Sequence, residues 1–247
     1  VQWRRCTMQN ITLSNYINPC IKTLIFSLIA IIFIPIEAEA QEIEEITVKA
    51  SYREIKLEKN DGSLLVLNEE ELKAQPIKHL EQLSFLVPNL NFALSDGRPR
   101  YFQIRGIGEQ SGYEGTPNSS VGLMIDDIDF SGQGGISSSF DMEQVEVHRG
   151  PQGSRMGANA LAGMIYMRSK EPTETFSGLS EVNLGSDGVR SIGLAFGGPM
   201  QNNPDTKYRF SIRQDQNDGF RKNIYLNRDD TTGQDEITAR FKLNHQL

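Results

Sequence analysis

Apolar and polar residues alternate along the C-terminal third of the chain. In TKYRFSIRQD the apolar Tyr208, Phe210 and Ile212 alternate with polar residues, and EITARFKLN repeats this pattern from Ile237 to Leu243. VRSIGLAFG alternates in the same way, and FSGLSEVNL does so more weakly. A two-residue period predicts strands with one apolar and one polar face. Two environments suit such strands: a half-buried soluble sheet, or a membrane barrel with lipid outside and water inside.

The links between these four predicted strands favour the barrel. Gly-Ser-Asp-Gly at 185–188 and a Pro-containing turn at 198–205 are short, whereas the polar stretch 216–235 is long. Short and long links alternate in outer-membrane barrels. A strand of about ten residues is also long enough to cross a bilayer. We therefore expect residues 173–247 to form about four strands of such a barrel.

Two short helices are predicted ahead of these strands. Asn68 can cap the first, because Glu71 stands at the capping-box spacing and two further acids favour the positive end of the helix dipole. Pro76 ends this helix. The second helix shows one buried face, because four apolar residues recur every three or four positions: Ile77, Leu80, Leu83 and Val87. His79 lies off this face and is expected to be a solvated surface residue.

Short strand-like runs follow these helices. LNFAL, YFQIRGIG, VGLMIDDIDF and MEQVEVHRG are separated by glycine, proline, serine and asparagine, as is typical of strands joined by turns. Asp126, Asp127 and Asp129 are expected to form a polar turn within the third run. Helices followed by such runs predict a compact α+β domain over residues 56–172.

The N-terminus is typical of an export signal. Lys22 precedes the apolar run TLIFSLIAIIFIPI, and Ala38 and Ala40 supply an A-x-A site. This pattern predicts a signal peptide over residues 1–40; Met8 is a candidate start, which would place residues 1–7 upstream of it. The alternative is a membrane anchor, which the acidic flank after Ile36 disfavours. Cys6 and Cys20 both precede the predicted cut, so the exported chain would contain no disulfide.

Charge and motifs argue against other classes of protein. The net charge is −7, and removal of residues 1–40 would leave 22 basic and 30 acidic residues, a net charge of −8. An acidic chain without basic clusters does not suit nucleic-acid binding. GIGEQSG lacks the third glycine of a dinucleotide loop, and DIDFSG lacks the glutamate that ends a calcium loop. With no GxSxG or paired histidines, we expect no enzyme, no metal site and no cofactor.

The stretch EQVEVHRGPQGSRMGANALAGMIYMRSKEP resembles the signature of TonB-dependent outer-membrane receptors, near the end of their plug domain. The resemblance continues through YFQIRGIG, VGLMIDDIDF and LNEEELKAQPIKHLEQLSFLVPNLNF, and the segment EEITVKA looks like a TonB box. It covers residues 42–247. By this resemblance the fold is an α+β plug domain followed by the first antiparallel strands of an outer-membrane β-barrel. Because about 22 strands close such a barrel and four cannot, the barrel is expected to be incomplete and the chain a fragment or truncated product.

The resemblance also implies residues and partners. TonB, which acts together with ExbB and ExbD, would pair with a leader at residues 41–55 as an added strand, through Glu44, Glu45, Ile46, Thr47, Val48, Lys49 and Ala50. The bare residues leave a frayed leader as the alternative. Arg105 and Arg149 would dock the plug to barrel glutamates. Arg98, Arg100 and Tyr113, in loops at 93–100 and 110–119, would contact the ligand, with ordinary loop residues as the alternative.

The expected function is active uptake of a scarce nutrient, a ferric siderophore being the first hypothesis, although haem, cobalamin and glycans use the same architecture. The chain would lie in the cell outer membrane, in contact with its lipid, with leader and plug facing the periplasm. The alternative is a non-transporting plug-domain binding module or a truncated pseudogene product.

Overall fold

The computed structural model describes residues 46–50, 55–56, 62–75, 77–95, 98–111, 118–201, 203–228 and 231–245. The chain separates into two units, Val1–Glu44 and Glu45–Leu247, and every described residue belongs to the second. The predicted signal peptide therefore lies outside the described residues. Within them, no helix combines the length and the apolar character that a membrane crossing requires.

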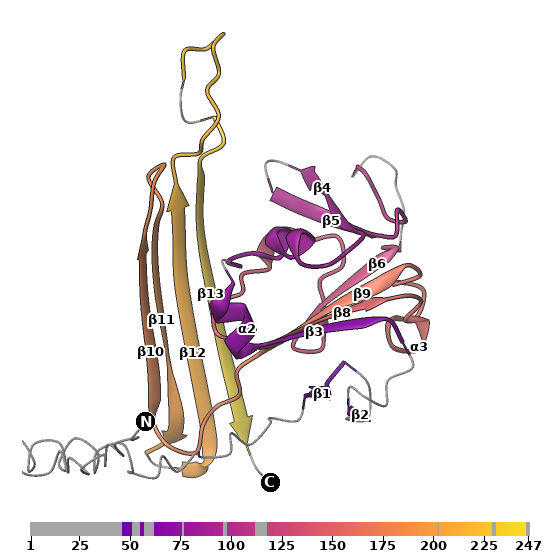
Figure 1. The fold of residues 1–247 in the computed structure, drawn as a ribbon. Helices are drawn as coiled ribbons and strands as arrows, with labels where there is room; N and C mark the ends of the chain where they lie inside the picture. The colour runs from indigo at the N-terminus through magenta and orange to yellow at the C-terminus, as the bar shows by residue number, and fades with distance from the viewer. Residues whose placement is uncertain are drawn as a thin grey trace, which may run out of the picture. The chain divides into compact units, whose positions relative to one another are not determined.

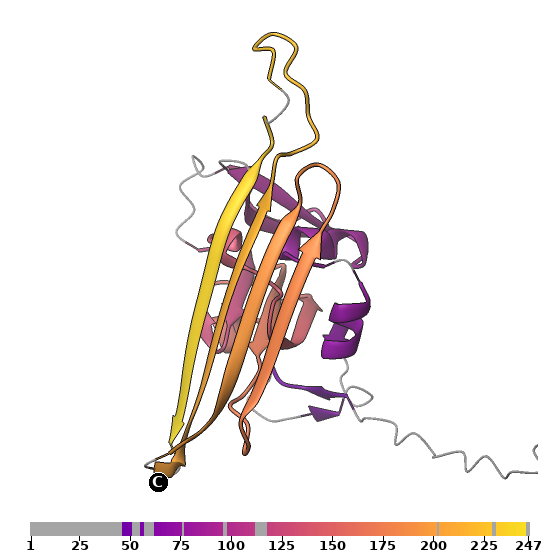
Figure 2. The same cartoon turned by 90° about the vertical axis from the view of Figure 1, so that its left-hand side faces the viewer.

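Four long strands form one antiparallel sheet, called the wall sheet below. These strands are β10 (Ser177–Leu184), β11 (Arg190–Met200), β12 (Asn203–Asn217) and β13 (Gln234–His245), and they pair in chain order. Figures 1 and 2 show them side by side. The four strands predicted from alternation are confirmed. The links after β10 and β12 lie at one end of the sheet, and the short turn after β11 lies at the other (Figure 1).

In the wall sheet the apolar face is exposed and the polar face is buried, which is the reverse of a half-buried soluble sheet. Large apolar side chains on one face are exposed: Val182, Leu184, Ile192, Leu194, Phe196, Ile212, Ile237, Phe241 and Leu243. Polar side chains on the other face are buried: Ser191, Lys207, Arg209, Ser211 and Arg213. A half-buried soluble sheet would cover its apolar face. The arrangement therefore favours the second environment, a barrel whose apolar face meets lipid.

The plug is built on a five-stranded mixed sheet. Its strands β3 (Leu64–Asn68), β6 (Val121–Ile125), β7 (Ile128–Asp129), β8 (Met142–Arg149) and β9 (Gly163–Ser169) lie in the order β3-β8-β9-β6-β7. The pairing of β6 with β9 is parallel and the others are antiparallel. Apolar residues on one face, such as Val145 and Val147, form the main core with Leu80, Leu83 and Phe102. The predicted α+β domain is thus confirmed in type.

The first predicted helix is confirmed with its cap. Helix α2 spans Glu69–Ala74, and Asn68 Oδ1 accepts a hydrogen bond from the Glu71 N–H at 2.8 Å. Glu71 Oε2 accepts the reciprocal bond from the Asn68 N–H at 3.0 Å. Both bonds of the capping box are therefore present, as the residue spacing indicated.

The second predicted helix is only partly right. All four residues of its expected apolar face are buried, but the chain there forms a 3-10 helix, η3 (Leu80–Phe85), that is shorter than predicted. The cause is tertiary: His79 is extended and forms a bridge with Ser138, so regular helix cannot begin before Leu80.

The prediction of a solvated His79 is wrong. The residue is only 5% exposed. Its Nε2 lies 3.2 Å from the Gly135 carbonyl oxygen, in the short 3-10 helix η4 (Gly134–Ile136), and its Nδ1 accepts a bond from the Glu81 N–H at 3.5 Å. A ring that donates through one nitrogen and accepts through the other is neutral. Helical periodicity missed this role because it does not report packing against a distant segment.

A two-stranded hairpin lies at one end of the plug. Strands β4 (Leu90–Ser95) and β5 (Arg98–Ile104) pair only with each other. They lie at the end of the wall sheet that carries the long β12–β13 link (Figure 1). The predicted loop at 93–100 is therefore mostly a hairpin.

Burial is the largest influence on His79 and lowers its pKa from 6.5, although the Gly135 carbonyl opposes this shift. The unfolded chain then binds the proton more readily, so stability falls as the pH drops below about 6.5 toward the lower folded value. We expect His79→Gln to lose less unfolding free energy than the parent between about pH 7 and pH 5. Urea titrations of both proteins in detergent micelles measure this difference, and equal losses would contradict it.

Candidate functional site

The leader is seated on the plug rather than frayed. Strand β1 (Thr47–Val48) pairs with β2 (Ile55–Lys56), and Val48 and Ala50 are each only 2% exposed. They cover the face of the plug sheet that points away from the main core. Glu44 and Glu45 of the predicted TonB box lie outside the described residues. The frayed alternative is thus incorrect for residues 46–50.

Strand β8 supplies the polar contacts to this leader. Glu146 Oε1 accepts hydrogen bonds from the Lys49 N–H at 2.6 Å and the Ala50 N–H at 3.2 Å. Gln144 Nε2 donates to the Thr47 carbonyl oxygen at 2.9 Å. Because side chains alternate along a strand, Gln144 and Glu146 share one face of β8. The sequence shows this alternation, but it does not show which segment covers the polar face.

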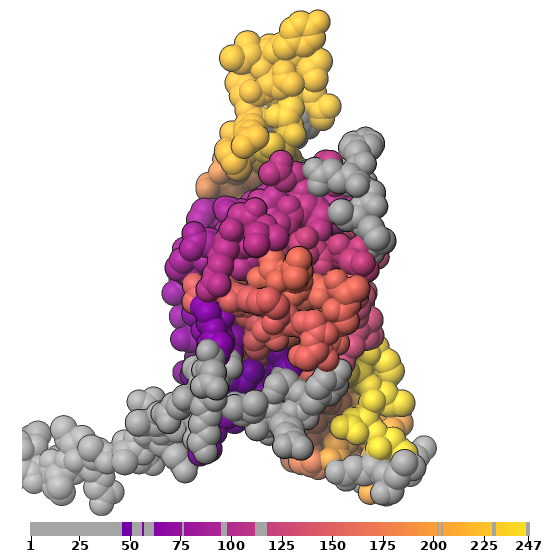
Figure 3. All heavy atoms as spheres, turned by 90° about the vertical axis from the view of Figure 1, so that its right-hand side faces the viewer, coloured from indigo at the N-terminus to yellow at the C-terminus, as the bar shows by residue number. Residues whose placement is uncertain are grey.

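The small residues of the signature form the apolar part of the seat. Ala50 packs in a cluster with Met124, Ala160, Met164 and Tyr166, and Ala160 lies in the loop 150–162 that joins β8 to β9. Figure 3 shows the side of the plug that carries this loop, in coral near the centre of the view. The loop contains one short helix, α3 (Gly153–Met156).

Close backbone approach explains the glycine that begins β9. A Cβ at Gly163 would lie 2.3 Å from the His148 carbonyl oxygen and 2.6 Å from Ile104 Cδ1. The first contact is with backbone, which cannot move aside cheaply. Small side chains in this stretch therefore let β8, β9 and β5 approach one another.

The turn Asp126–Asp127 is confirmed and has further contacts. Both aspartates have positive φ angles, 49° and 68°, which asparagine and aspartate tolerate better than most residues. Asp127 accepts hydrogen bonds from Arg155 and from the Tyr166 hydroxyl. Burial, followed by the charge of Asp127, raises the pKa of Tyr166 to about 12. The turn thereby contacts Tyr166, a member of the apolar cluster that packs against the leader.

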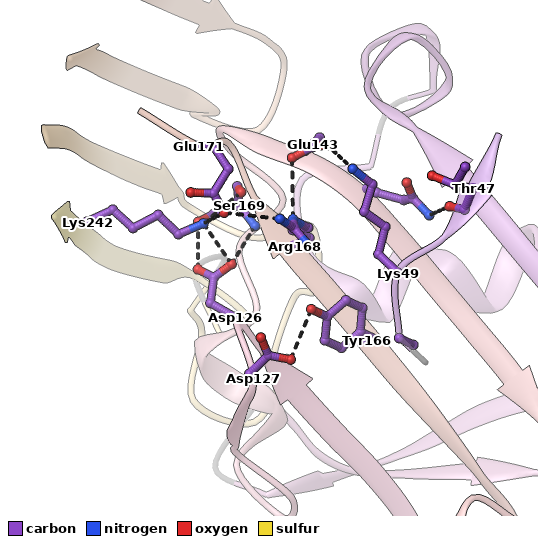
Figure 4. Close-up of polar contacts among 12 residues, drawn as sticks. Thr47, Lys49, Asp126, Asp127, Glu143, Tyr166, Arg168, Ser169, Glu171 and Lys242 are labelled. Atoms are coloured by element: carbon purple, nitrogen blue, oxygen red, sulfur yellow. Dashed lines mark hydrogen bonds and ion pairs between the residues drawn. The ribbon is translucent and has the colours of Figure 1, made fainter. Parts of the chain in front are cut away.

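A series of ion pairs links the leader to the wall sheet (Figure 4). Lys49 Nζ lies 3.1 Å from Glu143, and Glu143 lies 3.6 Å from Arg168. Arg168 contacts Glu171 at 3.3 Å, and Glu171 lies 3.2 Å from Lys242 of β13. These pairs are partly exposed, so each contributes at most about 1 kcal/mol. Together they form a continuous row of charged side chains that begins at Lys49 of the leader and ends at Lys242 of a wall strand.

Lys242 also holds the Asp126 turn. Its Nζ lies 3.1 Å from Asp126 Oδ1 and donates to the Ser169 carbonyl oxygen at 2.9 Å. Burial by itself would raise the pKa of Asp126. The hydrogen bonds from Ser169 and the charge of Lys242 outweigh burial and hold this pKa below 3.8. Asp126 is therefore a carboxylate at neutral pH, paired with the wall.

The most buried contact between plug and wall joins Asp141 to Arg209 of β12. Arg209 donates through Nε to Asp141 Oδ2 at 2.8 Å and through a terminal nitrogen to Oδ1, and both side chains are less than a tenth exposed. Arg240 of β13 donates to the carbonyl oxygens of Ser138 and Phe140 beside this pair. A bidentate arginine–carboxylate pair combines charge with fixed geometry.

The predicted docking arginines lie elsewhere. Arg105 follows β5 and Arg149 ends β8, and the contact of Ile104 with Gly163 brings these strand ends to one edge. That edge is near α3, on the side of the plug away from the wall sheet (Figure 1). No described acidic side chain forms an ion pair with either arginine, and Arg149 Nε is buried without a hydrogen-bond partner. Their docking role stays a prediction.

The three predicted ligand residues have different outcomes: one pairs with the wall, one is exposed, and one lies outside the described residues. Arg98 forms an ion pair with Glu236 of β13 and lies 3.9 Å from Glu81. Arg100 is exposed on β5, donates to the Gly132 carbonyl oxygen at 3.2 Å and lies over the Tyr101 ring. Tyr113 lies outside the described residues. The structure brings Arg98 and Arg100 to one hairpin and engages Arg98 with the wall.

This geometry agrees with the comparisons with known proteins. Residues 56–164 match the family described as the TonB-dependent receptor plug domain. The match identifies these residues as a plug domain of the TonB-dependent receptors, a family of receptors and transporters, and the structure combines this plug fold with partial barrel strands. The plug and wall described above are the corresponding parts.

Several known proteins are similar to this chain. The vitamin B12 transporter BtuB of Vibrio vulnificus is 26% identical over 113 residues, covering 46% of this chain and 18% of its own. The ferric enterobactin receptor PirA of Pseudomonas aeruginosa is 25% identical over 154 residues, covering 58% and 20%. The crystal structure of the ferric yersiniabactin receptor FyuA from Yersinia pestis matches with a TM-score of 0.64 at 25% identity, covering 74% and 29%. The chain thus spans about a fifth of the length of BtuB and PirA.

Removal of the buried plug–wall charge tests the contact between the two parts. Asp141→Asn would leave Arg209 without its anion, and an unpaired buried charge costs about 3 kcal/mol of unfolding free energy. The matched control is Glu171→Gln, which removes partly exposed pairs with Arg168 and Lys242 and should change stability by less than about 1 kcal/mol. Urea denaturation in detergent micelles measures both values. Equal losses in the two variants would contradict the assigned importance of Asp141.

Proposed function

We propose that this chain acts in active uptake across the cell outer membrane, with its leader as the handle that TonB pulls. One observation carries the proposal. The leader and the β4–β5 hairpin lie at opposite ends of a plug that is bound to barrel strands. Residues 47–50 lie toward the short β11–β12 turn, and the β4–β5 hairpin lies toward the long β12–β13 link (Figure 1). Outer-membrane barrels have short turns on the periplasmic side and longer loops outside.

The proposed organisation follows that orientation. Residues 1–40 act as the signal peptide, residues 41–55 as the leader, 56–172 as the plug, and 173–247 as the first barrel strands. The leader and plug face the periplasm, where TonB, energised through ExbB and ExbD, reaches residues 44–50. A short β-prone segment suits capture by strand addition, because backbone bonds supply the affinity.

The plug would contact the barrel at two sides. The acidic side meets the basic face of β12 and β13, as described above. Arg105 and Arg149 lie at the other edge, and we propose that carboxylates of further wall strands pair with them. This proposal is supported by the buried, unpartnered Nε of Arg149.

The cargo proposed is a ferric siderophore, an anionic chelate. PirA and FyuA, two of the relatives, are named for ferric siderophores, whereas BtuB is named for vitamin B12. Arg100, exposed on the outward hairpin, is the described residue best placed to meet an anion, and Arg98 and Tyr113 are proposed as further contacts. The alternative of a non-transporting plug module is favoured by no specific contact.

Proline substitutions in the leader test whether uptake can be lost while ligand binding is retained. Val48→Pro or Ile46→Pro removes a backbone N–H and blocks strand pairing. In the native host we expect growth under iron limitation to fall to that of a receptor-deletion strain, while cell-surface binding of the ferric chelate is retained. Growth under cobalamin or glycan limitation serves as the comparison for cargo. Normal iron-limited growth of both variants would show that residues 44–50 are not the TonB-binding segment.

A further inference from the structure

Glu146 is a fully buried carboxylate at the centre of the leader's seat. Its side chain is 0% exposed, and donors approach it from two directions. Lys49 N–H and Ala50 N–H bind it from the leader, at 2.6 Å and 3.2 Å. Gln144 Nε2 at 2.9 Å and His148 Nε2 at 2.8 Å bind it from its own strand. Burying a carboxylate is costly unless such bonds replace its water.

These bonds use the groups that strand pairing requires. An added strand binds through backbone N–H and C=O groups. In the seated leader, the N–H groups of Lys49 and Ala50 are bound to Glu146, and the Thr47 carbonyl is bound to Gln144. The side chains of Val48 and Ala50 are also buried against the plug. A leader cannot be seated in this way and offer the same groups to another strand.

The contact of Glu146 with the leader is suited to release because it is made to backbone N–H groups. Two peptide N–H groups at one carboxylate resemble the way an anion is held by successive backbone amides. When the leader leaves, water can replace these two donors, while Gln144 and His148 remain on β8. Both the seated and the released states therefore leave Glu146 hydrogen-bonded, which permits exchange between them.

We propose that Glu146 is a positioning residue that holds residues 47–50 on the plug and so limits their access to a strand-forming partner. The identity of that partner, TonB, rests on the proposed function. The inference goes beyond it by naming the residue that controls access. Glu143 on the same strand contacts the leader at the Lys49 side chain, at 3.1 Å, and also pairs with Arg168. It provides the matched control.

Amide hydrogen exchange tests the hold without any partner. Glu146→Gln keeps the shape of the side chain but replaces one acceptor oxygen with a donor NH₂ group, which faces the leader N–H groups unfavourably. We expect exchange at Lys49 and Ala50 to become at least about tenfold faster, a change equivalent to about 1.4 kcal/mol. Exchange at Val145 and Val147 should stay unchanged, which shows that β8 is intact. The measurement uses the full chain in detergent micelles, observed by NMR.

The control and a second variant keep the test decisive. Glu143→Gln should alter exchange at Lys49 and Ala50 by less than about twofold, because it removes only two part-exposed ion pairs, with Lys49 and Arg168. Lys49→Pro removes one leader N–H without changing β8, and it should speed exchange at Ala50 even if Glu146→Gln fails to fold. Exchange at Ala50 within twofold of the parent in Lys49→Pro, or in a folded Glu146→Gln, would overturn the proposal.

A binding measurement tests the limit on access. The soluble C-terminal domain of TonB is the probe, and a synthetic peptide of residues 44–50 reports whether that domain recognises the free leader. If the peptide binds, we expect Glu146→Gln to bind the domain at least about tenfold more tightly than the parent. Equal affinity of parent and variant, with the peptide bound, would overturn the access limit. If the peptide itself does not bind, the proposed partner fails, and the exchange data still decide the role of Glu146.

Discussion

Neutralisation of charge between the plug and the wall sheet is the interaction on which the rest of the structure depends. The covered face of the wall sheet carries Lys207, Arg209 and Arg213 on β12, and Arg240 and Lys242 on β13. Cations removed from water are costly unless anions or carbonyl oxygens replace the water. Asp126, Asp141 and Glu171 of the plug, with the carbonyl oxygens of residues 138, 140 and 169, supply them for Arg209, Arg240 and Lys242. Lys207 pairs with Glu174, and Arg213 pairs with Glu181 and Asp215 of the wall sheet itself.

The leader is connected to this plug–wall contact through a row of ion pairs. The plug sheet has one apolar face, which forms the main core, and one polar face around Gln144 and Glu146. The leader covers the polar face through backbone hydrogen bonds, and the row of Lys49, Glu143, Arg168, Glu171 and Lys242 continues from it to the wall. A displacement of the leader would therefore break the pair of Lys49 with Glu143, at one end of a row whose other end is Lys242 of the wall sheet.

Much of this fold could be predicted from the sequence because its signals are local. Period-two alternation indicated the four wall strands, and the spacing of Asn68 and Glu71 indicated the capped start of α2. The polar turn at Asp126 and Asp127 was also evident. These features depend on neighbouring residues, so a single sequence contains them.

The parts that could not be predicted depend on contacts between distant segments. His79 is buried because Gly135 and Ser138 reach it from more than 50 residues away. The seat of the leader joins residues 47–50 to 144–146, and the acids that meet Arg209 and Lys242 come from turns. The resemblance to TonB-dependent receptors indicated the family, but it pointed to plug arginines for docking. Among the described contacts, plug acids pair with Arg209 and Lys242 of the wall, and Arg98 of the plug pairs with Glu236. The docking role of Arg105 and Arg149 stays a prediction.

The central claim is that the apolar face of the wall sheet meets lipid while its basic face is neutralised by the plug. Photolabelling from the lipid phase tests this most directly, with the full chain reconstituted in bilayers that contain a lipid-borne photoreactive probe. The account predicts labelling at Leu194, Ile237 and Phe241, whose side chains are exposed, and none at Ser191, Arg209 and Ser211, whose side chains are buried. Equal labelling of the two sets, or labelling of the second set alone, would contradict it.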